Sequence, residues 1–214
     1  MLFTTKISKL SRFLKVFGNQ KIKLLDVGVG NHSPSQFRKY FPTSIYHGID
    51  LDINYNNTAE DIKNIDQFFQ LDLTKLEFDE IPDNYYDAIV MAHIIEHLDN
   101  GYQVISKLST KLKSGGYIYI EYPSAKSVNF PSKEGTLNFY DDPTHVKIYN
   151  LEEVSSAVID DGFEIISKGV RRNLFNILIM PIKIIHNKIK YKYVMGSVYW
   201  DLYGFAEYIW ARKK

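Results

Sequence analysis

Residues 24–37 read LLDVGVGNHSPSQF, and this stretch decides the fold. Its apolar start, together with the residues just before it, predicts a short buried strand over residues 22–27. Gly28 and Gly30 follow immediately, and after them the sequence becomes polar. Glycines at this spacing let the backbone turn sharply and come close to a ligand, because no Cβ atoms stand in the way. The stretch therefore predicts a strand followed by a bend built to hold a ligand.

The residues after this bend predict a helix and then an acid. Ser33, Pro34 and Gln36 indicate a helix that Ser33 caps and that Gln36 joins in a capping box. The free N–H groups at such a helix start suit an anionic group. Asp50 closes the next expected strand, 20 residues after Gly30, where a carboxylate can bind both hydroxyls of a ribose. Together these features indicate a nucleoside ligand with a polar or acidic tail.

Strand and helix signals alternate along the rest of the chain. The expected strands after the first are residues 45–50, 67–73, 86–92, 117–122, 163–170 and 198–210. The expected helices are residues 1–20, 94–112, 150–161 and 174–189. Because nearly all the strands are apolar throughout, we expect a parallel sheet covered on both faces, an α/β fold. No linker divides the chain, so we expect one domain over residues 1–214.

Composition limits the possible functions. The chain has 214 residues, no cysteine and a formal net charge of +1. The lack of cysteine excludes disulfides, thiol catalysis and thiolate metal sites. Residues 171–214 contain nine Lys/Arg and two Asp/Glu, a net of +7, whereas residues 1–170 have a net of −6. We therefore expect residues 1–20 to form an amphipathic helix and residues 174–196 a basic helical insert before the last strand.

Two cofactors suit the glycine bend and the acid after it: a dinucleotide and S-adenosylmethionine. The dinucleotide fingerprint G-x-G-x-x-G would need a third glycine where Ser33 stands. Asp26, at the strand end, favours the sulfonium donor, because an acid there can order the loop and reach the ammonium of a methionine moiety. A nicotinamide oxidoreductase is the weaker alternative.

Five segments together resemble a class I S-adenosylmethionine-dependent methyltransferase of the small-molecule O- or N-methylating type. They are 24-LLDVGVG-30, 48-GID-50, 71-LDL-73, 87-DAIVMAHIIEHL-98 and 112-LKSGGYIYIEYPS-124. The resemblance covers roughly residues 20–170. It implies a Rossmann-like three-layer αβα fold, with a seven-stranded, mostly parallel sheet and an antiparallel last strand. The family often has a glycine at the position of His32. This difference is expected to alter how the following helix begins.

The resemblance also implies which residues bind the cofactor. The first strand and bend would hold the methionine part, the acid of 48-GID-50 the ribose, and Asp72 the exocyclic amine of adenine. His93, at the end of the fourth strand, would lie beside the cofactor. The complete expected set is Asp26, Gly28, Gly30, Asp50, Leu51, Asp72, Leu73 and His93.

Three histidines are candidates for the catalytic chemistry. A hydroxyl acceptor must lose its proton, and histidine is suited to accept it near neutral pH. His93 and His97 are four residues apart, and we expect them on one helical face with Glu96 alongside. His145 follows the fifth strand and is expected to converge on the same crevice. The resemblance implies that His97 is the base, and the alternative is a hydrogen-bonded structural histidine.

The sequence thus predicts an S-adenosylmethionine-dependent methyltransferase that O-methylates a small-molecule or glycan-linked acceptor. The acceptor class follows from the aromatic C-terminal segment and from the lack of a basic nucleic-acid groove. We assign no metal ligand, although His93, Glu96, His97 and His145 have atoms suited to a divalent metal. A metal-dependent RNA-end 2′-O-methyltransferase and a noncatalytic cofactor-binding subunit are therefore the alternatives.

The N-terminal residues contain no continuous apolar run of signal-peptide type, and no apolar stretch reaches the length of a membrane span. We therefore expect a cytoplasmic protein, with nucleic acid not expected as a partner. The basic C-terminal segment is a candidate for peripheral contact with an anionic membrane, through lysines at positions 183, 188, 190 and 192.

Overall fold

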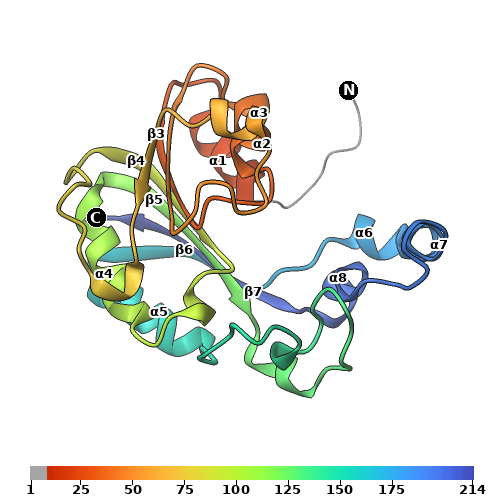
Figure 1. The fold of residues 1–214 in the computed structure, drawn as a ribbon. Helices are drawn as coiled ribbons and strands as arrows, with labels where there is room; N and C mark the ends of the chain where they lie inside the picture. Colours follow the sequence, from red (N-terminus) through yellow and green to blue (C-terminus); the bar gives the residue numbers. More distant parts are fainter. Residues whose placement is uncertain (1–8) are drawn as a thin grey trace.

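A seven-stranded sheet forms the centre of the computed structural model, which describes residues 9–214 (Figure 1). The strands are β1 (Lys23–Val27), β2 (Ile45–Asp50), β3 (Gln67–Gln70), β4 (Tyr86–Ala92), β5 (Leu112–Pro123), β6 (Phe163–Val170) and β7 (Ala206–Lys213). Their order across the sheet is β3-β2-β1-β4-β5-β7-β6. β7 runs antiparallel to both of its neighbours, and every other neighbouring pair is parallel. The expected Rossmann-like sheet with an antiparallel last strand is confirmed.

Helices connect these strands. The α-helices are α1 (Lys9–Phe17), α2 (Ser33–Tyr40), α3 (Ala59–Lys63), α4 (Gly101–Lys111), α5 (Leu151–Asp160), α6 (Leu174–Leu178), α7 (Met180–Tyr191) and α8 (Trp200–Tyr203). Short 3₁₀ turns are η1 (Leu73–Lys75), η2 (Ile95–His97), η3 (Ala125–Asn129), η4 (Phe139–Asp141) and η5 (Gly196–Tyr199). Within residues 9–214, none of these helices has the length and apolar character needed to cross a membrane.

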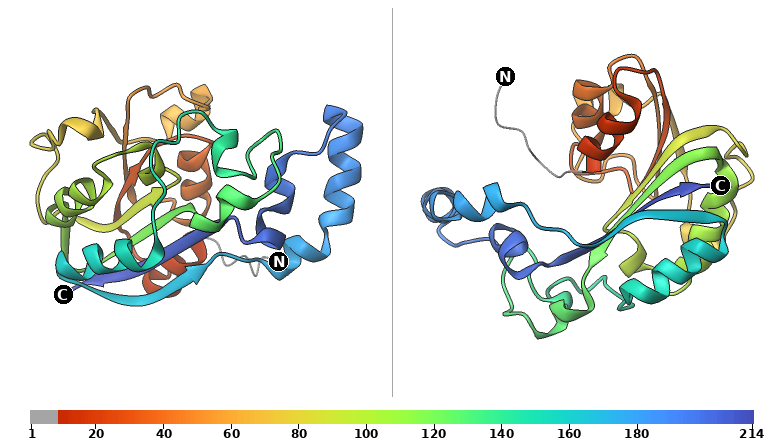
Figure 2. Two further views of the ribbon diagram at one scale, coloured as in Figure 1. Left: turned by 90° about the horizontal axis from the view of Figure 1, so that it is seen from below. Right: turned by 180° about the vertical axis from the view of Figure 1, so that it is seen from behind.

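The helices cover the two faces of the sheet as two layers (Figures 1 and 2). On one face, Phe13 of α1 and Phe37 of α2 pack with the strand residues Tyr46 and Val90. On the other face, α4 and α5 enclose a larger apolar core that includes Ile89. Each fully buried aromatic or aliphatic side chain contributes roughly 1.5–3 kcal/mol to stability. Helices thus cover both faces of the sheet of apolar strands, as predicted. The carboxyl ends of the parallel strands lie together at one edge of the sheet.

The segment after β4 differs from the expected helix over residues 94–112. It divides into η2 and, after a turn, α4, which begins only at Gly101. His93 precedes both with a left-handed backbone, at φ 58°. The expectation that His93 and His97 share a helical face is therefore wrong, because no continuous helix joins them. The turn residues Asp99 and Asn100 carry the local signal for this break.

The C-terminal region also differs from expectation. Residues 198–210 do not form one strand; η5 and α8 occupy the first part, and β7 starts at residue 206. Gly204, at φ +71°, ends α8, and its N–H donates to the carbonyl of Trp200. The basic insert is present as α6 and α7, with Pro181 in the first turn of α7.

Other expected bounds shift by a few residues. β5 begins at Leu112 rather than at residue 117, and β3 ends at Gln70 because Asp72 caps η1. The helix over residues 150–161 is confirmed as α5, with the Asn150 side chain accepting a hydrogen bond from the N–H of Glu152. The expected N-terminal helix is seen as α1 over Lys9–Phe17, and its first positions lie outside the described residues.

Candidate active site

The glycine bend after β1 is held against the neighbouring strand. Gly28 has φ +81°, and the N–H groups of Gly28 and Val29 both donate to the carbonyl of Ile49, at 2.8 and 3.1 Å. A Cβ atom at Gly28 would lie 1.9 Å from Cδ1 of Ile94. Residue 28 must therefore be glycine for two reasons: the left-handed backbone and the close side chain of Ile94.

The loop after β2 packs on the second glycine of the bend. A Cβ atom at Gly30 would lie 3.0 Å from the carbonyl oxygen of Tyr55 and 3.3 Å from its ring. The Asn57 side-chain amide donates to the carbonyl of Val29 at 3.2 Å. The bend is therefore enclosed by the loop that follows the expected ribose-binding acid, and a larger residue at position 30 would displace that loop.

The start of α2 differs from the capping box expected from Ser33 and Gln36. His32 is the N-cap residue, with φ 62°, and makes no side-chain cap hydrogen bond. Its Nδ1 atom instead lies 2.7 Å from Oδ2 of Asp61, a buried carboxylate that also caps α3. Position 32, where the family often has glycine, thus has the left-handed backbone that glycine adopts easily.

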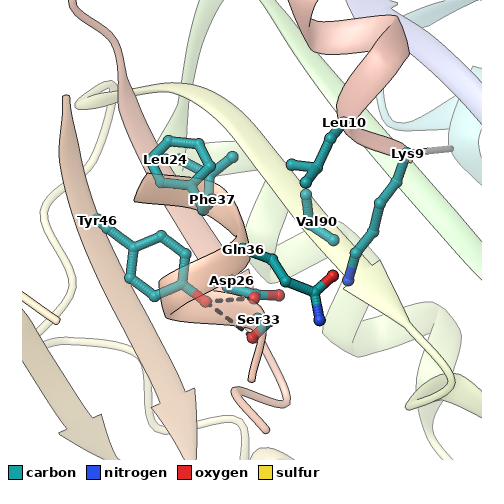
Figure 3. Close-up of a pocket in the computed structure, with 9 residues that line it drawn as sticks. All are labelled: Lys9, Leu10, Leu24, Asp26, Ser33, Gln36, Phe37, Tyr46 and Val90. Atoms are coloured by element: carbon teal, nitrogen blue, oxygen red, sulfur yellow. Dashed lines mark hydrogen bonds between the residues drawn. The ribbon is translucent and has the colours of Figure 1, made fainter. Parts of the chain in front are cut away.

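Asp26 is buried inside the protein rather than open at the crevice. Its side chain faces a small cavity between α1, α2 and the sheet, drawn in Figure 3. Oδ2 of Asp26 accepts a hydrogen bond from the Tyr46 hydroxyl, which also lies 3.0 Å from the Ser33 hydroxyl. Burial, and then the charge of Asp26, raises the pKa of Tyr46. Asp26 therefore connects β1 to the start of α2, which agrees with a loop-ordering role.

The acids after β2 and β3 lie at the same edge of the sheet. Oδ1 of Asp50 accepts a hydrogen bond from the N–H of Leu51 at 2.7 Å, and partial burial raises the pKa of Asp50. Leu51 itself is 62% exposed. Oδ1 of Asp72 accepts from the N–H and the hydroxyl of Thr74, and these bonds lower the pKa of Asp72. Leu73 packs against the main core.

His93 lies between two carboxylates. Its N–H donates to the Glu121 carbonyl at 2.7 Å; its Nδ1 is 3.2 Å from Oε1 of Glu96, and its Nε2 is 3.1 Å from Oε1 of Glu121. Burial alone would lower the pKa of His93, but the hydrogen bonds with Glu121 and Glu96 and their charges raise it to about 9. His93 is therefore a cation at neutral pH and has no free lone pair with which to accept a proton.

Glu121 is the centre of this ion network. Burial alone would raise its pKa, but the hydrogen bond with His93 and the charge of Arg171 lower it to about 2. Nε of Arg171 lies 3.2 Å from Oε1 of Glu121, and the Tyr119 hydroxyl donates to Oε2. The β4–β5 register, which pairs Ala92 with Glu121, places this carboxylate next to His93. The sequence alone did not identify Glu121 as the partner of His93, because the pairing depends on a strand register that the local pattern does not specify.

His97 and His145 converge, as expected from the sequence. Their ring centroids are 4.9 Å apart. Nδ1 of His97 lies 3.1 Å from the Thr144 carbonyl oxygen, and Nδ1 of His145 lies 2.6 Å from that of Phe139. A carbonyl can only accept, so each Nδ1 carries the proton and each neutral ring keeps its lone pair on Nε2. Two imidazoles whose Nδ1 atoms face backbone carbonyls therefore lie side by side.

Glu96 links these two histidines to His93. It is 1% exposed, and its Oε1 lies 3.9 Å from Nε2 of His145 as well as close to His93. Its Oε2 is buried without a hydrogen-bond partner among the described residues. Glu96, His97 and His145 each offer one ligand atom within 4.8 Å of the others. His93 is outside this group, because its two nitrogens face carboxylates.

Comparison with known proteins places the chain in a family. The profile of a methyltransferase domain family matches residues 2–168, and the chain belongs to that family. An uncharacterized protein of Methanocaldococcus jannaschii is 30% identical over 109 residues, which is 45% of this chain and 27% of that protein. The chain thus matches only about a quarter of the length of this curated relative.

Solved structures show the same fold. A methyltransferase from Mesorhizobium loti, dependent on S-adenosylmethionine, has a TM-score of 0.67 at 13% identity, covering 94% of this chain and 96% of that one. One from Archaeoglobus fulgidus has a TM-score of 0.59 at 21% identity, covering 95% and 91%. Phosphoethanolamine N-methyltransferase 2 of Haemonchus contortus, solved with phosphomonomethylethanolamine and S-adenosylhomocysteine, has a TM-score of 0.66 at 20% identity, covering 95% and 52%.

Family and fold together define an S-adenosylmethionine-dependent methyltransferase, so the predicted enzyme class and cofactor are confirmed. The residues expected to bind this cofactor lie at one edge of the sheet. Gly28 and Gly30 contribute no side chains of their own to the bend, although Ile94 and Tyr55 pack against it, and carboxylates stand at Asp50, the end of β2, and at Asp72, after β3. A partly buried apolar side chain, Ile94, lies beside the bend and suits an adenosine moiety.

Proposed function

We propose that the protein transfers a methyl group to a hydroxyl oxygen of a small-molecule or glycan-linked acceptor, with His97 as the general base. The observation that carries this proposal is the orientation of His97. Its Nδ1 faces the Thr144 carbonyl, so the lone pair of the neutral ring is on Nε2. The His97 ring is only partly buried and lies next to His145, whose side chain is 5% exposed. An accessible, oriented lone pair is what abstraction of a hydroxyl proton requires.

The cofactor supplies an electrophilic methyl group on a sulfonium, and its transfer is an in-line displacement. The chain's own residues position the reactants. Asp50 and Asp72 would hold the ribose hydroxyls and the adenine amine, and the glycine bend would admit the donor closely. When the acceptor oxygen gains the methyl group, its proton moves to Nε2 of His97. Solvent or His145 can then receive that proton and regenerate the neutral imidazole.

We assign His93 a positioning role rather than that of a base. Its raised pKa keeps it protonated, and both nitrogens bind carboxylates. A cation there fixes Glu96, whose backbone carbonyl in turn accepts hydrogen bonds from the N–H groups of Val146 and Lys147. The segment that carries His145 is thereby tied to the segment that carries His97.

The partly buried indole of Trp200, beside His93, supports the acceptor class. The Trp200 ring lies 5.1 Å from the His93 ring and stacks on Phe205 at 4.7 Å. Phe205 is 1% exposed, so the partly buried indole of Trp200 is the ring that would offer a stacking face to a sugar or an aromatic acceptor. The indole N–H of Trp200 donates to the carbonyl of Thr136, which fixes the ring in place.

The test is replacement of His97 by Gln. We expect the methyl-transfer rate to a panel of hydroxylated glycans and phenols to fall about 10²–10⁴-fold, because that is the usual contribution of a general base. Affinity for S-adenosylhomocysteine, measured by calorimetry, should stay unchanged. His186→Gln on the exposed part of α7 is the matched control and should keep full activity. Full activity of the His97 variant would refute the assignment of the base.

A divalent metal bound by Glu96, His97 and His145 is the second candidate for the chemistry. Two observations favour it: Oε2 of Glu96 is buried without a partner, and both histidines point Nδ1 at backbone carbonyls, as metal-binding histidines commonly do. One carboxylate and two imidazoles suit zinc or a similar transition metal, which would polarise the acceptor hydroxyl. A preparation that contains no metal by elemental analysis, and whose activity resists chelation, would exclude this candidate.

A further inference from the structure

Helices α6 and α7 present exposed aliphatic side chains on their outer surfaces. The residues, with their exposed fractions, are Leu174 (75%), Leu178 (78%), Ile182 (68%), Ile185 (60%) and Ile189 (69%); together they are the apolar row. Spacings of three and four residues place the members on one face of each helix. α7 stands away from the sheet and its helical layers in all three views (Figures 1 and 2). A row of this kind on a soluble surface marks an interaction site.

The surface around the apolar row is basic. Residues 171–200 contain six Lys/Arg and no Asp/Glu. Lys188, Lys190 and Lys192 are exposed along α7 and just after it, and Tyr191 and Tyr193 are about one-third exposed, at 37% and 38%. An apolar face with lysines and interfacial aromatic rings beside it is the pattern of helices that lie in the surface of a bilayer.

We propose that the apolar row and the lysines beside it dock this protein on an anionic lipid membrane. The aliphatic side chains would enter the boundary between headgroups and acyl chains, and the lysines would contact the anionic headgroups. Residues 1–170 have a net charge of −6, so the negative potential of the membrane surface repels the body of the protein while it attracts the lysines.

The charge also decides between lipid and a second copy of the chain. A symmetric dimer through this face would bring the exposed Lys188, Lys190 and Lys192 of two copies together, and residues 171–200 hold no acid to neutralise them. An anionic bilayer supplies both an apolar interior and the opposite charge. The lipid surface is therefore the occupant that both observations favour.

The insert is fixed to the ion network of the candidate site, so docking would orient that site. The Asn173 side chain caps α6, and the Asn173 N–H donates to Oδ1 of Asp201 in α8 at 2.8 Å. Arg171, which contacts Glu121, also lies 3.4 Å from Asp201. The acceptor would then be a hydroxylated molecule held at the membrane surface. This statement about the acceptor, unlike the docking itself, rests on the proposed function.

The test is binding to lipid vesicles without any cofactor or acceptor. We expect the protein to sediment with vesicles of phosphatidylcholine and phosphatidylglycerol, and to bind phosphatidylcholine alone much more weakly. The triple variant Ile182→Ser, Ile185→Ser, Ile189→Ser should weaken binding at least about hundredfold, since each lost methylene matters for partitioning. Replacement of Lys188 and Lys190 by Gln should weaken binding to the anionic vesicles about fivefold for each lysine.

Matched controls and refuting results separate the explanations. Ile159→Ser on α5 and Ile166→Ser on β6 change side chains that are 50% and 49% exposed outside the insert, and neither should alter binding. Failure of the wild type to bind anionic vesicles, or equal binding by the triple variant, would overturn the proposal. A wild-type dimer that the triple variant converts to a monomer without lipid binding would assign the row to a second copy. Calorimetry with S-adenosylhomocysteine on the same samples tests the donor site separately.

Discussion

Replacement of Gly28 by Ala tests the physical basis of the glycine bend. The new methyl group would meet Cδ1 of Ile94 at 1.9 Å and Cγ1 at 2.4 Å, and the residue would keep a φ of +81°. The left-handed backbone costs an L-residue about 1–2 kcal/mol. Insertion of a carbon into a packed site costs about 1–3 kcal/mol more, because the Ile94 side chain must move. We expect the free energy of unfolding to fall by about 2–5 kcal/mol in total.

Gly162→Ala is the matched control. Gly162 has a nearly identical φ of +87°, but a Cβ atom there would have no heavy atom of residues 9–214 within 4 Å. This variant should lose only the backbone contribution of about 1–2 kcal/mol. Both substitutions reduce the flexibility of the unfolded chain to the same extent, so that effect cancels when the two are compared. The difference between the two variants therefore measures the contact with Ile94.

Urea unfolding followed by circular dichroism gives both free energies, and calorimetry gives the affinity for S-adenosylhomocysteine. We expect Gly28→Ala to weaken this affinity at least about tenfold, since the bend must shift by a fraction of an ångström beside the donor. Gly162→Ala should leave the affinity unchanged. Equal losses of stability in the two alanine variants would refute the packing explanation, and unchanged affinity in Gly28→Ala would refute the role of the bend.

Three further predictions follow from the ion network and the caps. His93 has a raised pKa, so its charged contacts stabilise the fold fully below pH 6.5 and lose this effect as the pH rises through about 9. In urea unfolding at several pH values, the wild type should therefore lose stability over this range, and His93→Gln should not. Glu121 has a pKa lowered from 4.5 to about 2, so its stabilisation is present above pH 4.5 and lost as the pH falls toward 2; in Glu121→Gln, NMR titration should find the pKa of His93 lower than in the wild type. Asp61→Asn should cost about 1–2 kcal/mol by loss of the capping box with Thr58, measured as a lower urea midpoint; an unchanged midpoint would contradict it.

Strand positions were predictable because the signal is local. Apolar runs between polar turns identified β2, β4 and β6 at the observed bounds, and Asn150 and Gly162 marked both ends of α5. The antiparallel last strand followed from the family resemblance. These features depend on hydrophobic periodicity and on turn chemistry, which a single sequence carries.

The errors fall where local patterns compete. The apolar residues from Ile95 to Leu112 suggested one helix, but the turn at Asp99 and Asn100 divides it. The aromatic run after residue 198 suggested a strand, but Gly204 closes a helical turn first. In both places a short turn signal outweighed a longer apolar pattern.

The sequence predicted which residues come together in the candidate site, but it did not predict whether they are protonated. The convergence of His97 and His145 was expected and is observed at 4.9 Å. The protonation of His93 was not predictable, because it depends on Glu121 and Arg171, which reach it through strand pairing and through the insert. A charge state depends on neighbours that are distant in sequence, so it needs the tertiary structure.

The position of β7 between β5 and β6 has a consequence for biosynthesis. Both neighbours are synthesised before residues 206–213, so each lacks a backbone partner on that edge until β7 pairs with it. Such edges recruit other strands and promote aggregation of nascent chains. The eight residues of β7 pair with both β5 and β6, so this last strand covers both free edges. The sheet therefore becomes complete only after residues 206–213 have been translated.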